Sequence, residues 1–152
     1  MEVHVLGPAH ADALARFFEV LKTHGIDKAF HPHPFTAEEA LERAHYAGKD
    51  LYFILLKGRD VMGYAMLRGW DEGYEVPSLG ICVHPHEQRR GLGRMLMDFL
   101  HFAALRRGAK KIRLRVYRDN KSAITFYRSL GYELTEDRDC RYLLGVLDLD
   151  CN

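Results

Sequence analysis

The stretch from residue 88 to residue 94 constrains the fold of this chain more than any other part. It reads Gln-Arg-Arg-Gly-Leu-Gly-Arg, follows an apolar run at residues 79–83, and opens an amphipathic segment at residues 92–105. This order predicts a strand, a basic glycine-rich loop and a helix. The first backbone N–H groups of a helix have no internal partner, and the helix dipole adds partial positive charge there. We therefore expect this loop to bind a phosphate-bearing ligand.

Glycines and arginines have different tasks in such a loop. Gly91 and Gly93 would let the backbone approach a bulky phosphate, and permanent positive charge comes from Arg89, Arg90 and Arg94. Two familiar phosphate-binding patterns are not matched. A dinucleotide fingerprint needs a further glycine where the chain has Leu96, and a P-loop needs Gly-Lys-Ser/Thr after its glycines. A tight connection without any ligand is the alternative for a bare Gly-x-Gly turn.

A second informative block covers residues 120–132 and reads Asn-Lys-Ser-Ala-Ile-Thr-Phe-Tyr-Arg-Ser-Leu-Gly-Tyr. Asn120 can cap the start of a helix. Ala123, Tyr127 and Leu130 recur at helical spacing, so they would share one face. Gly131 is placed to end the helix in a left-handed turn.

Together the two blocks resemble the motifs of the GNAT superfamily of N-acetyltransferases. The family carries Gln/Arg-x-x-Gly-x-Gly/Ala on its cofactor loop, and Gln88, Gly91 and Gly93 match it. The family also carries Asn-x-x-Ala-x-x-Phe-Tyr-x-x-x-Gly-Phe/Tyr downstream, which is matched by Asn120, Ala123, Phe126, Tyr127, Gly131 and Tyr132. The motifs lie in the family's order and at about its usual separation, and the resemblance covers residues 51–149.

The resemblance implies acetyl-coenzyme A as the acyl donor. Its pyrophosphate would lie on the N–H groups of residues 89–94, and its pantetheine arm would pair, like a strand, with the backbone of residues 81–83. Asn120 would face the pantetheine side of the cleft. The donor-binding residues that the resemblance implies are Ile81, Cys82, Val83, Gln88, Arg89, Arg90, Gly91, Leu92, Gly93, Arg94, Asn120, Ala123 and Phe126.

The implied reaction is attack of a neutral amine on the thioester carbonyl, with a strand N–H near Cys82 steadying the oxyanion. Tyr127 is the expected general acid for the departing thiolate, because a phenol stays protonated at pH 7. Simple packing of the Tyr127 ring is the alternative. In many family members a Glu acts as the general base at the position where this chain has Pro77. Glu75, on the same strand face by period-2 alternation, is the candidate base, and an exposed carboxylate without a role is the alternative.

The amine acceptor is less defined. In the family, the region before the second helix walls the acceptor pocket, so the implied acceptor contacts are His31, His33 and Phe35. Acidic residues in the loop at residues 70–76 would attract a cationic amine. A small amine, an amino sugar and a protein amine all stay open. A non-catalytic acyl-CoA-binding sensor is the alternative function.

Two His-Pro-His triplets, at residues 31–33 and 84–86, raise the question of a metal site. The proline between each pair splays the histidines, and no acidic or cysteine ligand sits beside either pair. We therefore expect no metal. His84 and His86 are expected to shape the turn between the strand and the loop.

Hydrophobic periodicity predicts strands at residues 3–6, 51–57, 61–68, 73–83, 111–116, 132–136 and 140–149, and helices at 9–24, 36–48, 92–107 and 120–130. Thr36 with Glu39 forms a capping-box pattern, and Gly48 is expected to end that helix. Because helices return between strands, we expect an α/β fold: one domain (1–152) with a mixed sheet of about seven strands and helices on both faces. The resemblance implies the same order, with the sheet splayed between its fourth and fifth strands.

Charge and composition argue against nucleic-acid and membrane partners. A net charge of +1 gives no general attraction to nucleic acid. The longest apolar run, residues 51–56, is too short for a bilayer, and no signal peptide is apparent. Cys82, Cys140 and Cys151 form an odd, scattered set that suits a reducing compartment. We expect a cytoplasmic protein, without nucleic-acid or membrane partners, that acts on a small-molecule or protein amine; a homodimer through the C-terminal strand stays open.

Overall fold

A computed structural model describes residues 1–149 of the chain, so Cys151 lies outside the described residues. The strands are β1 (Glu2–Val5), β2 (Leu51–Lys57), β3 (Asp60–Arg68), β4 (Ser78–Val83), β5 (Lys111–Tyr117), β6 (Glu133–Glu136) and β7 (Tyr142–Asp148). The helices of four or more residues are α1 (Ala11–Thr23), α2 (Ala37–Ala44), α3 (Leu92–Arg106) and α4 (Lys121–Ser129). Within these residues no helix is long and apolar enough to cross a membrane.

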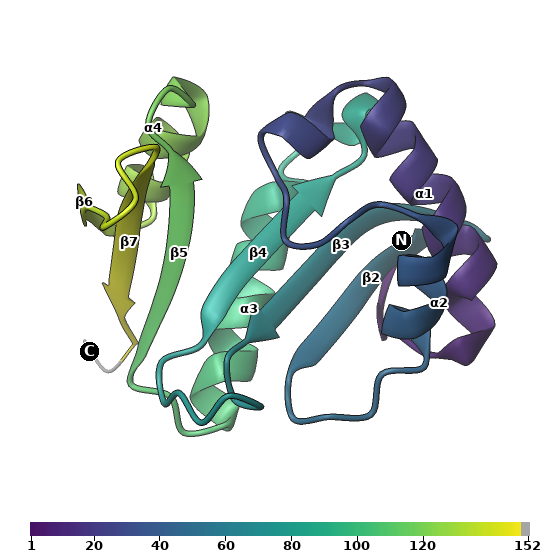
Figure 1. Ribbon diagram of the computed structural model, residues 1–152, viewed down its shortest axis with the longest axis horizontal. Coiled ribbons are helices and arrows are strands. Elements are labelled where there is room, and N and C mark those ends of the chain that lie inside the picture. The colour runs from purple at the N-terminus through teal and green to yellow at the C-terminus, as the bar shows by residue number, and fades with distance from the viewer. Residues whose placement is uncertain (150–152) are drawn as a thin grey trace.

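The strands form one mixed sheet in the order β1-β2-β3-β4-β5-β7-β6 (Figure 1). β4 and β5 are the parallel neighbours, and they are paired at one position, Ser78 with Arg113. Beside that pair, the Arg113 N–H donates to the Pro77 carbonyl at 3.0 Å. The two strands therefore meet at one end and diverge towards Val83, which divides the sheet into two parts (Figure 1).

Alternation along the strands explains why helices cover both faces. Tyr64 and Met66 on β3 point to a core beneath α1 and α2, where Phe18 is fully buried. Their neighbours Ala65 and Leu67 point to the opposite core beneath α3. Successive strand side chains face opposite sides of a sheet, so one apolar strand feeds both cores. The predicted α/β fold with a mixed sheet and helices on both faces is confirmed.

Helix ends follow the local sequence. The Thr36 hydroxyl accepts the N–H of Glu39 at 3.0 Å, and the Asn120 side chain accepts the N–H of Ala123 at 3.3 Å. Gly131 has a left-handed φ of +96°, as predicted for the residue that ends α4. The end of α2 differs from the prediction, because this helix stops at Ala44 before it reaches Gly48.

The start of β4 also differs from the predicted strand at residues 73–83. β4 begins at Ser78, and the preceding segment is a turn in which the N–H groups of Gly73 and Tyr74 donate to the carbonyls of Trp70 and Gly69 at 3.1 and 3.0 Å. Pro77 has no N–H with which to extend the ladder. Glu75 therefore does not lie on the strand, and the prediction that places it on a strand face is wrong.

Candidate active site

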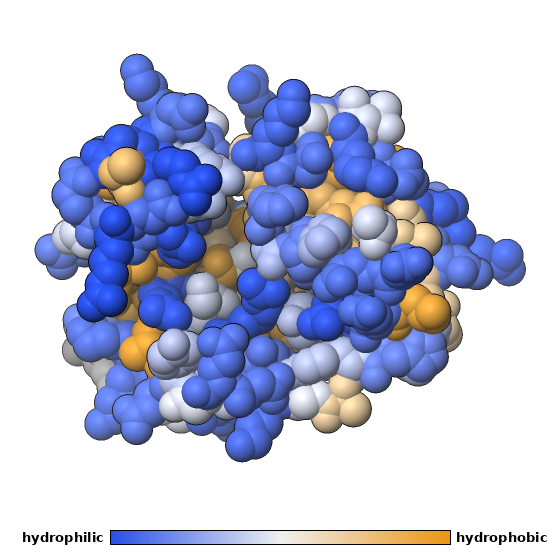
Figure 2. Space-filling view, in the orientation of Figure 1, coloured by the Kyte–Doolittle hydropathy of each residue, from blue (hydrophilic) through white to orange (hydrophobic). Residues whose placement is uncertain are grey.

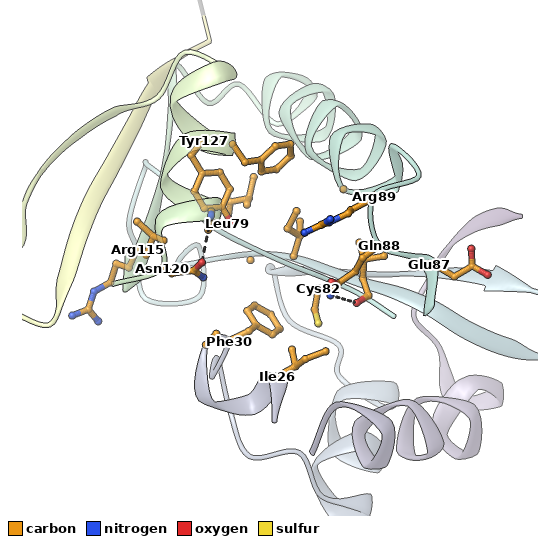
Figure 3. Close-up of a pocket in the computed structure, with 18 of the residues that line it drawn as sticks. Ile26, Phe30, Leu79, Cys82, Glu87, Gln88, Arg89, Arg115, Asn120 and Tyr127 are labelled. Carbon is orange, nitrogen blue, oxygen red and sulfur yellow. Dashed lines mark hydrogen bonds between the residues drawn. The ribbon is translucent and has the colours of Figure 1, made fainter. Parts of the chain in front are cut away.

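A cavity of about 490 Å³ occupies the gap between β4 and β5. The surface is hollowed between the two parts of the sheet, and apolar side chains lie at the bottom of the hollow (Figure 2). The cavity brings together ten of the residues predicted from the two motifs: Ile81, Cys82, Val83, Gln88, Arg89, Gly93, Asn120, Ala123, Phe126 and Tyr127. Tyr127 points into the cavity from α4, while Ile26 and Phe30 enter from the opposite side (Figure 3).

The open edge of β4 supplies backbone hydrogen-bonding groups to this cavity. In an antiparallel ladder, backbone groups point alternately towards and away from the partner strand. The His84 N–H donates to Met62 on the β3 side at 2.8 Å, while the Pro77 carbonyl faces β5. By this alternation, Ile81 and Val83 direct their N–H and C=O groups into the gap. The N–H of Cys82 is directed towards β3 instead, so an oxyanion donor would come from a neighbour of Cys82.

The start of α3 lies at one end of the cavity. Gly91 is the N-cap with a left-handed φ of +81°, and within residues 1–149 no side chain caps this helix. The N–H groups of the first turn, from Leu92 to Arg94, therefore point outwards without an intrahelical partner. They lie at the helix start where the sequence predicts an anion site, although Gly91, Leu92 and Arg94 do not themselves line the cavity.

The arginines of the loop have different environments. Arg89 lines the cavity and adopts a positive φ of +64°, a conformation that is strained for a residue with a side chain. Arg90 instead contacts Glu87, with 3.2 Å between its Nη1 and Oε2. Glu87 is buried and also lies 3.5 Å from the Lys57 ammonium. The charge of Arg90 is thus compensated within the loop, while Arg89 faces the cavity.

Tyr127 lines the cavity from α4. Its ring is partly buried against Phe126 and Tyr132, with centroid distances of 5.6 and 5.9 Å. Burial raises the pKa of Tyr127 to about 12, and the nearby Cys82 thiol adds to the shift. Burial also raises the pKa of Cys82 to about 12, so this thiol stays protonated too. A tyrosine in this setting therefore holds its proton at neutral pH.

A second cavity of about 340 Å³ continues the first one. The two cavities share lining residues from the N-terminal segment and both splayed strands, namely Ala29, Phe30, Leu79, Gly80 and Arg115. A side chain at Gly80 would place its Cβ 3.1 Å from Met66 Cγ and 3.2 Å from Phe30 Cε1. Glycine at this strand position therefore permits the close approach that shapes the cleft.

The structure separates the predicted acceptor contacts. His31 lines the second cavity. His33 is 8% exposed and its Nε2 lies 2.8 Å from the Tyr64 hydroxyl, while Phe35 is 3% exposed and packs on Phe18. Burial lowers the pKa of His33 to about 4. Residues 33 and 35 are thus core residues that do not reach the cleft, because the chain bends at residues 32 and 33 and His31 does not share their direction.

Glu75 also lies elsewhere. It lines a separate cavity together with Trp70 and Arg107. Asp71, from the same acidic loop, accepts the N–H of Lys49 at 2.8 Å and a hydrogen bond from a tyrosine. These acidic groups do not line the cleft, so the predicted roles of Glu75 as base and of this loop in attracting the amine lack the required geometry. Among the described residues, the one carboxylate that lines either part of the cleft is Glu87.

The sequence reading missed several residues of the cleft, which are Ile26, Phe30, Arg68, Arg115, Tyr117 and Tyr142. Two signals were available. Gly80 inside a strand indicates a close approach of another group. Along β5, Ile112, Leu114 and Val116 are buried, so the intervening polar residues belong to the opposite face.

The chain is similar in sequence or fold to several known proteins. The acetyltransferase (GNAT) family model matches residues 15–132. Acetyltransferase SG1711 of Sodalis glossinidius is 32% identical over 108 residues, which are 71% of this chain and 72% of that protein. The ribosomal-protein-S18-alanine N-acetyltransferase of Escherichia coli has 22% identity and a TM-score of 0.70, covering 99% of this chain and 95% of that one. PaiA N-acetyltransferase of Thermoplasma acidophilum, in complex with coenzyme A, has 14% identity and a TM-score of 0.79, covering 97% and 98%.

The two structural likenesses show the fold, while the family match and the sequence relative cover most of the motif-bearing part of the chain. With the splayed sheet, the uncapped helix start and the Asn120-to-Tyr132 block in place, the chain belongs to the acetyltransferase (GNAT) family.

Proposed function

We propose that this protein transfers an acetyl group from acetyl-CoA to a primary amine. The observation that carries the proposal is the single pairing position between β4 and β5, which leaves a strand edge open between the start of α3 and Tyr127. An elongated donor with an anionic end, amide groups along its arm and a reactive thioester suits that arrangement.

The cleft fits such a donor in three ways. The uncapped N–H groups of residues 92–94 and the guanidinium of Arg89 suit a pyrophosphate. The backbone groups of Ile81 and the N–H of Val83 suit the amides of a pantetheine arm, which would add to β4 like a strand, while the Val83 carbonyl accepts the Gln88 side-chain amide at 3.5 Å. The coenzyme A complex of the PaiA structure supports this choice of donor.

The chemistry is an acyl transfer by direct attack. The lone pair of a neutral amine forms a C–N bond with the thioester carbonyl, and a free N–H on the β4 edge stabilises the negative charge on oxygen. The C–S bond then breaks, and the sulfur takes the proton of the Tyr127 hydroxyl. The proton released by the amine returns to Tyr127 through solvent. The raised pKa of Tyr127 keeps it in the protonated form that this step needs.

Loss of the first proton from the ammonium form needs a different group from Glu75. Within residues 1–149 no carboxylate lines the second cavity, which leaves the imidazole of His31 or a water molecule to accept the proton. The guanidinium groups of Arg68 and Arg115 line the same cavity. Nearby positive charge lowers the pKa of a bound ammonium group, and this favours the neutral amine.

Calorimetry and turnover together test the proposal. We expect micromolar binding of acetyl-CoA and no binding of ATP or NAD under the same conditions. Turnover should then be measured with small amines, amino sugars and a peptide with a free N-terminal alanine, the last because of the S18-alanine enzyme among the structural relatives. Acetyl-CoA binding without turnover of any amine would favour the alternative, a non-catalytic acyl-CoA-binding sensor. Failure to bind acetyl-CoA would refute the proposal.

A further inference from the structure

We infer that the acceptor amine carries an anionic group, a carboxylate or a phosphate, and that Arg68 binds this group in the second cavity. The inference rests on the proposed function, because it assigns a substrate class to the acceptor end of the same cleft. It comes from the charge and the accessibility of the side chains that line this cavity.

The second cavity lies on one face of the sheet, across the splay. Arg68 on β3, Ser78 on β4 and Tyr117 on β5 all line it, and Tyr142 on β7 adds a further hydroxyl. The segment that contains His31 and Pro32 closes the cavity from the other side. A ligand here would meet side chains from four strands, and its amine would be directed to the first cavity and Tyr127 along the shared lining at Leu79 and Gly80.

Two arginines line this cavity, and they differ in whether a carboxylate neutralises them. Arg115 is compensated, because its Nε and Nη2 lie 3.0 and 2.8 Å from Asp137 Oδ2 and its guanidinium stacks 4.0 Å from the Tyr142 ring centroid. Arg68 is half-buried at the end of β3, and no carboxylate of residues 1–149 lies within ion-pair distance of it. A partly buried guanidinium is stabilised by a planar or tetrahedral anion that accepts two hydrogen bonds.

The remaining polar groups also suit an anion. Ser78 and Tyr117 can donate hydroxyl protons to it, and the Tyr142 hydroxyl donates to the Tyr117 hydroxyl at 3.1 Å. Lysine-like acceptors with further positive charges would meet repulsion from Arg68 in this lining. The volume of about 340 Å³ is at the lower end of the range for small-molecule sites, so it selects a compact acceptor.

Matched pairs of acceptors test the inference. Glucosamine 6-phosphate with glucosamine forms the phosphate arm, and β-alanine with β-alaninamide forms the carboxylate arm. In at least one arm we expect kcat/KM for the anionic member to exceed that for its uncharged partner by about 10- to 100-fold, the range of a charge-assisted hydrogen bond. The arm that shows the preference identifies the anion.

Three variants assign the preference to Arg68. Arg68→Met keeps the aliphatic stem and should reduce the preference to about onefold, because kcat/KM falls much more for the anionic member than for its uncharged partner; acetyl-CoA affinity should stay the same. Arg68→Lys should restore part of the preference. Arg59→Met removes one positive charge from an exposed turn and should leave the preference unchanged. Thermal unfolding of each variant checks that the fold is retained.

The possible failures are distinguishable. Equal or faster turnover of uncharged amines or of the alanine peptide, with no effect of Arg68→Met, would overturn the anionic acceptor while the acetyltransferase function stands. Intact acetyl-CoA binding with no turnover in either arm or with any other amine would overturn the proposed function and the inference with it.

Discussion

The two ends of the cleft are built in different ways. The proposed donor end consists of backbone groups of two short continuous segments, the loop before α3 and the edge of β4, with Tyr127 from the neighbouring α4. The acceptor end uses side chains from four strands and from the segment before α2. Backbone recognition depends on glycines and caps at fixed spacing, so it leaves a continuous pattern in the sequence. A site made of side chains from separate strands leaves none.

The first His-Pro-His triplet shows this difference within three residues. His31 lines the acceptor cavity, whereas His33 is bonded to Tyr64 in the core. The same residue type two positions apart thus has a surface role and a packing role. Local sequence does not decide between them, because the decision depends on which strands lie beneath the segment.

The largest effect is expected on turnover, from a change at Tyr127. Tyr127→Phe removes the proton donor and keeps the ring, so kcat should fall by about 10²- to 10⁴-fold while acetyl-CoA affinity stays nearly unchanged. Single-turnover kinetics with calorimetry would measure both. Tyr132→Phe is the control, since it removes a hydroxyl bonded to His101 at 2.7 Å and should mainly affect stability. A large loss of affinity with normal turnover would sink the proton-donor role of Tyr127.

The next largest effect is expected on acetyl-CoA affinity, from a change in the loop before α3. Gly91→Val places a branched side chain at a φ of +81° on the N-cap of α3, next to the free N–H groups proposed to hold the anion. We expect acetyl-CoA affinity to fall by about 100-fold, measured by calorimetry. Gly58→Val is a matched control with a φ of +63° and similar open space in the β2–β3 turn. Equal affinities for the two variants would refute the assignment of the loop.

A smaller effect is expected on stability, where the buried His33 should make the free energy of unfolding depend on pH. The folded protein binds a proton at His33 only near pH 4, whereas the unfolded chain does so near pH 6.5, so the unfolded state binds more protons between these values. The free energy of unfolding should therefore fall by about 2 kcal/mol from pH 7.5 to pH 5 on account of His33. Denaturant unfolding at several pH values would measure this slope.

His33→Gln should flatten the slope, since glutamine does not titrate there. The slope that remains would come partly from His84 and His101, whose pKa values burial also lowers. His24→Gln, at an exposed position, should keep the slope of the unmodified protein. An unchanged slope in His33→Gln would contradict burial of a neutral imidazole at this position.

The smallest effect concerns the shape of the acceptor end. Gly80→Ala should push Phe30 and Met66 outwards and raise KM for the acceptor by about three- to tenfold, a modest cost of misplacing a bound substrate. Gly63→Ala is the matched control, because its Cβ would lie 3.1 Å from Leu96 and 3.2 Å from Leu55, but it lines neither cavity. Similar KM values for both variants would show that the close approach at Gly80 does not shape the acceptor site.

Features that depend on neighbouring residues could be predicted from the amino-acid sequence. The caps at Thr36 and Asn120, the left-handed Gly131 and the uncapped helix start after Gly91 all follow from short-range backbone hydrogen bonding. The motifs at residues 88–94 and 120–132 predicted the loop before α3 and the family, and the order of strands and helices predicted the mixed sheet. The side chains that line the cleft away from these motifs depend on the tertiary structure. The turn before Pro77 moved Glu75 away from the cleft, and strand pairing brought Arg68 to the same cavity as Arg115 and Tyr142. Pairing between distant strands sets such neighbours, and no local spacing encodes it.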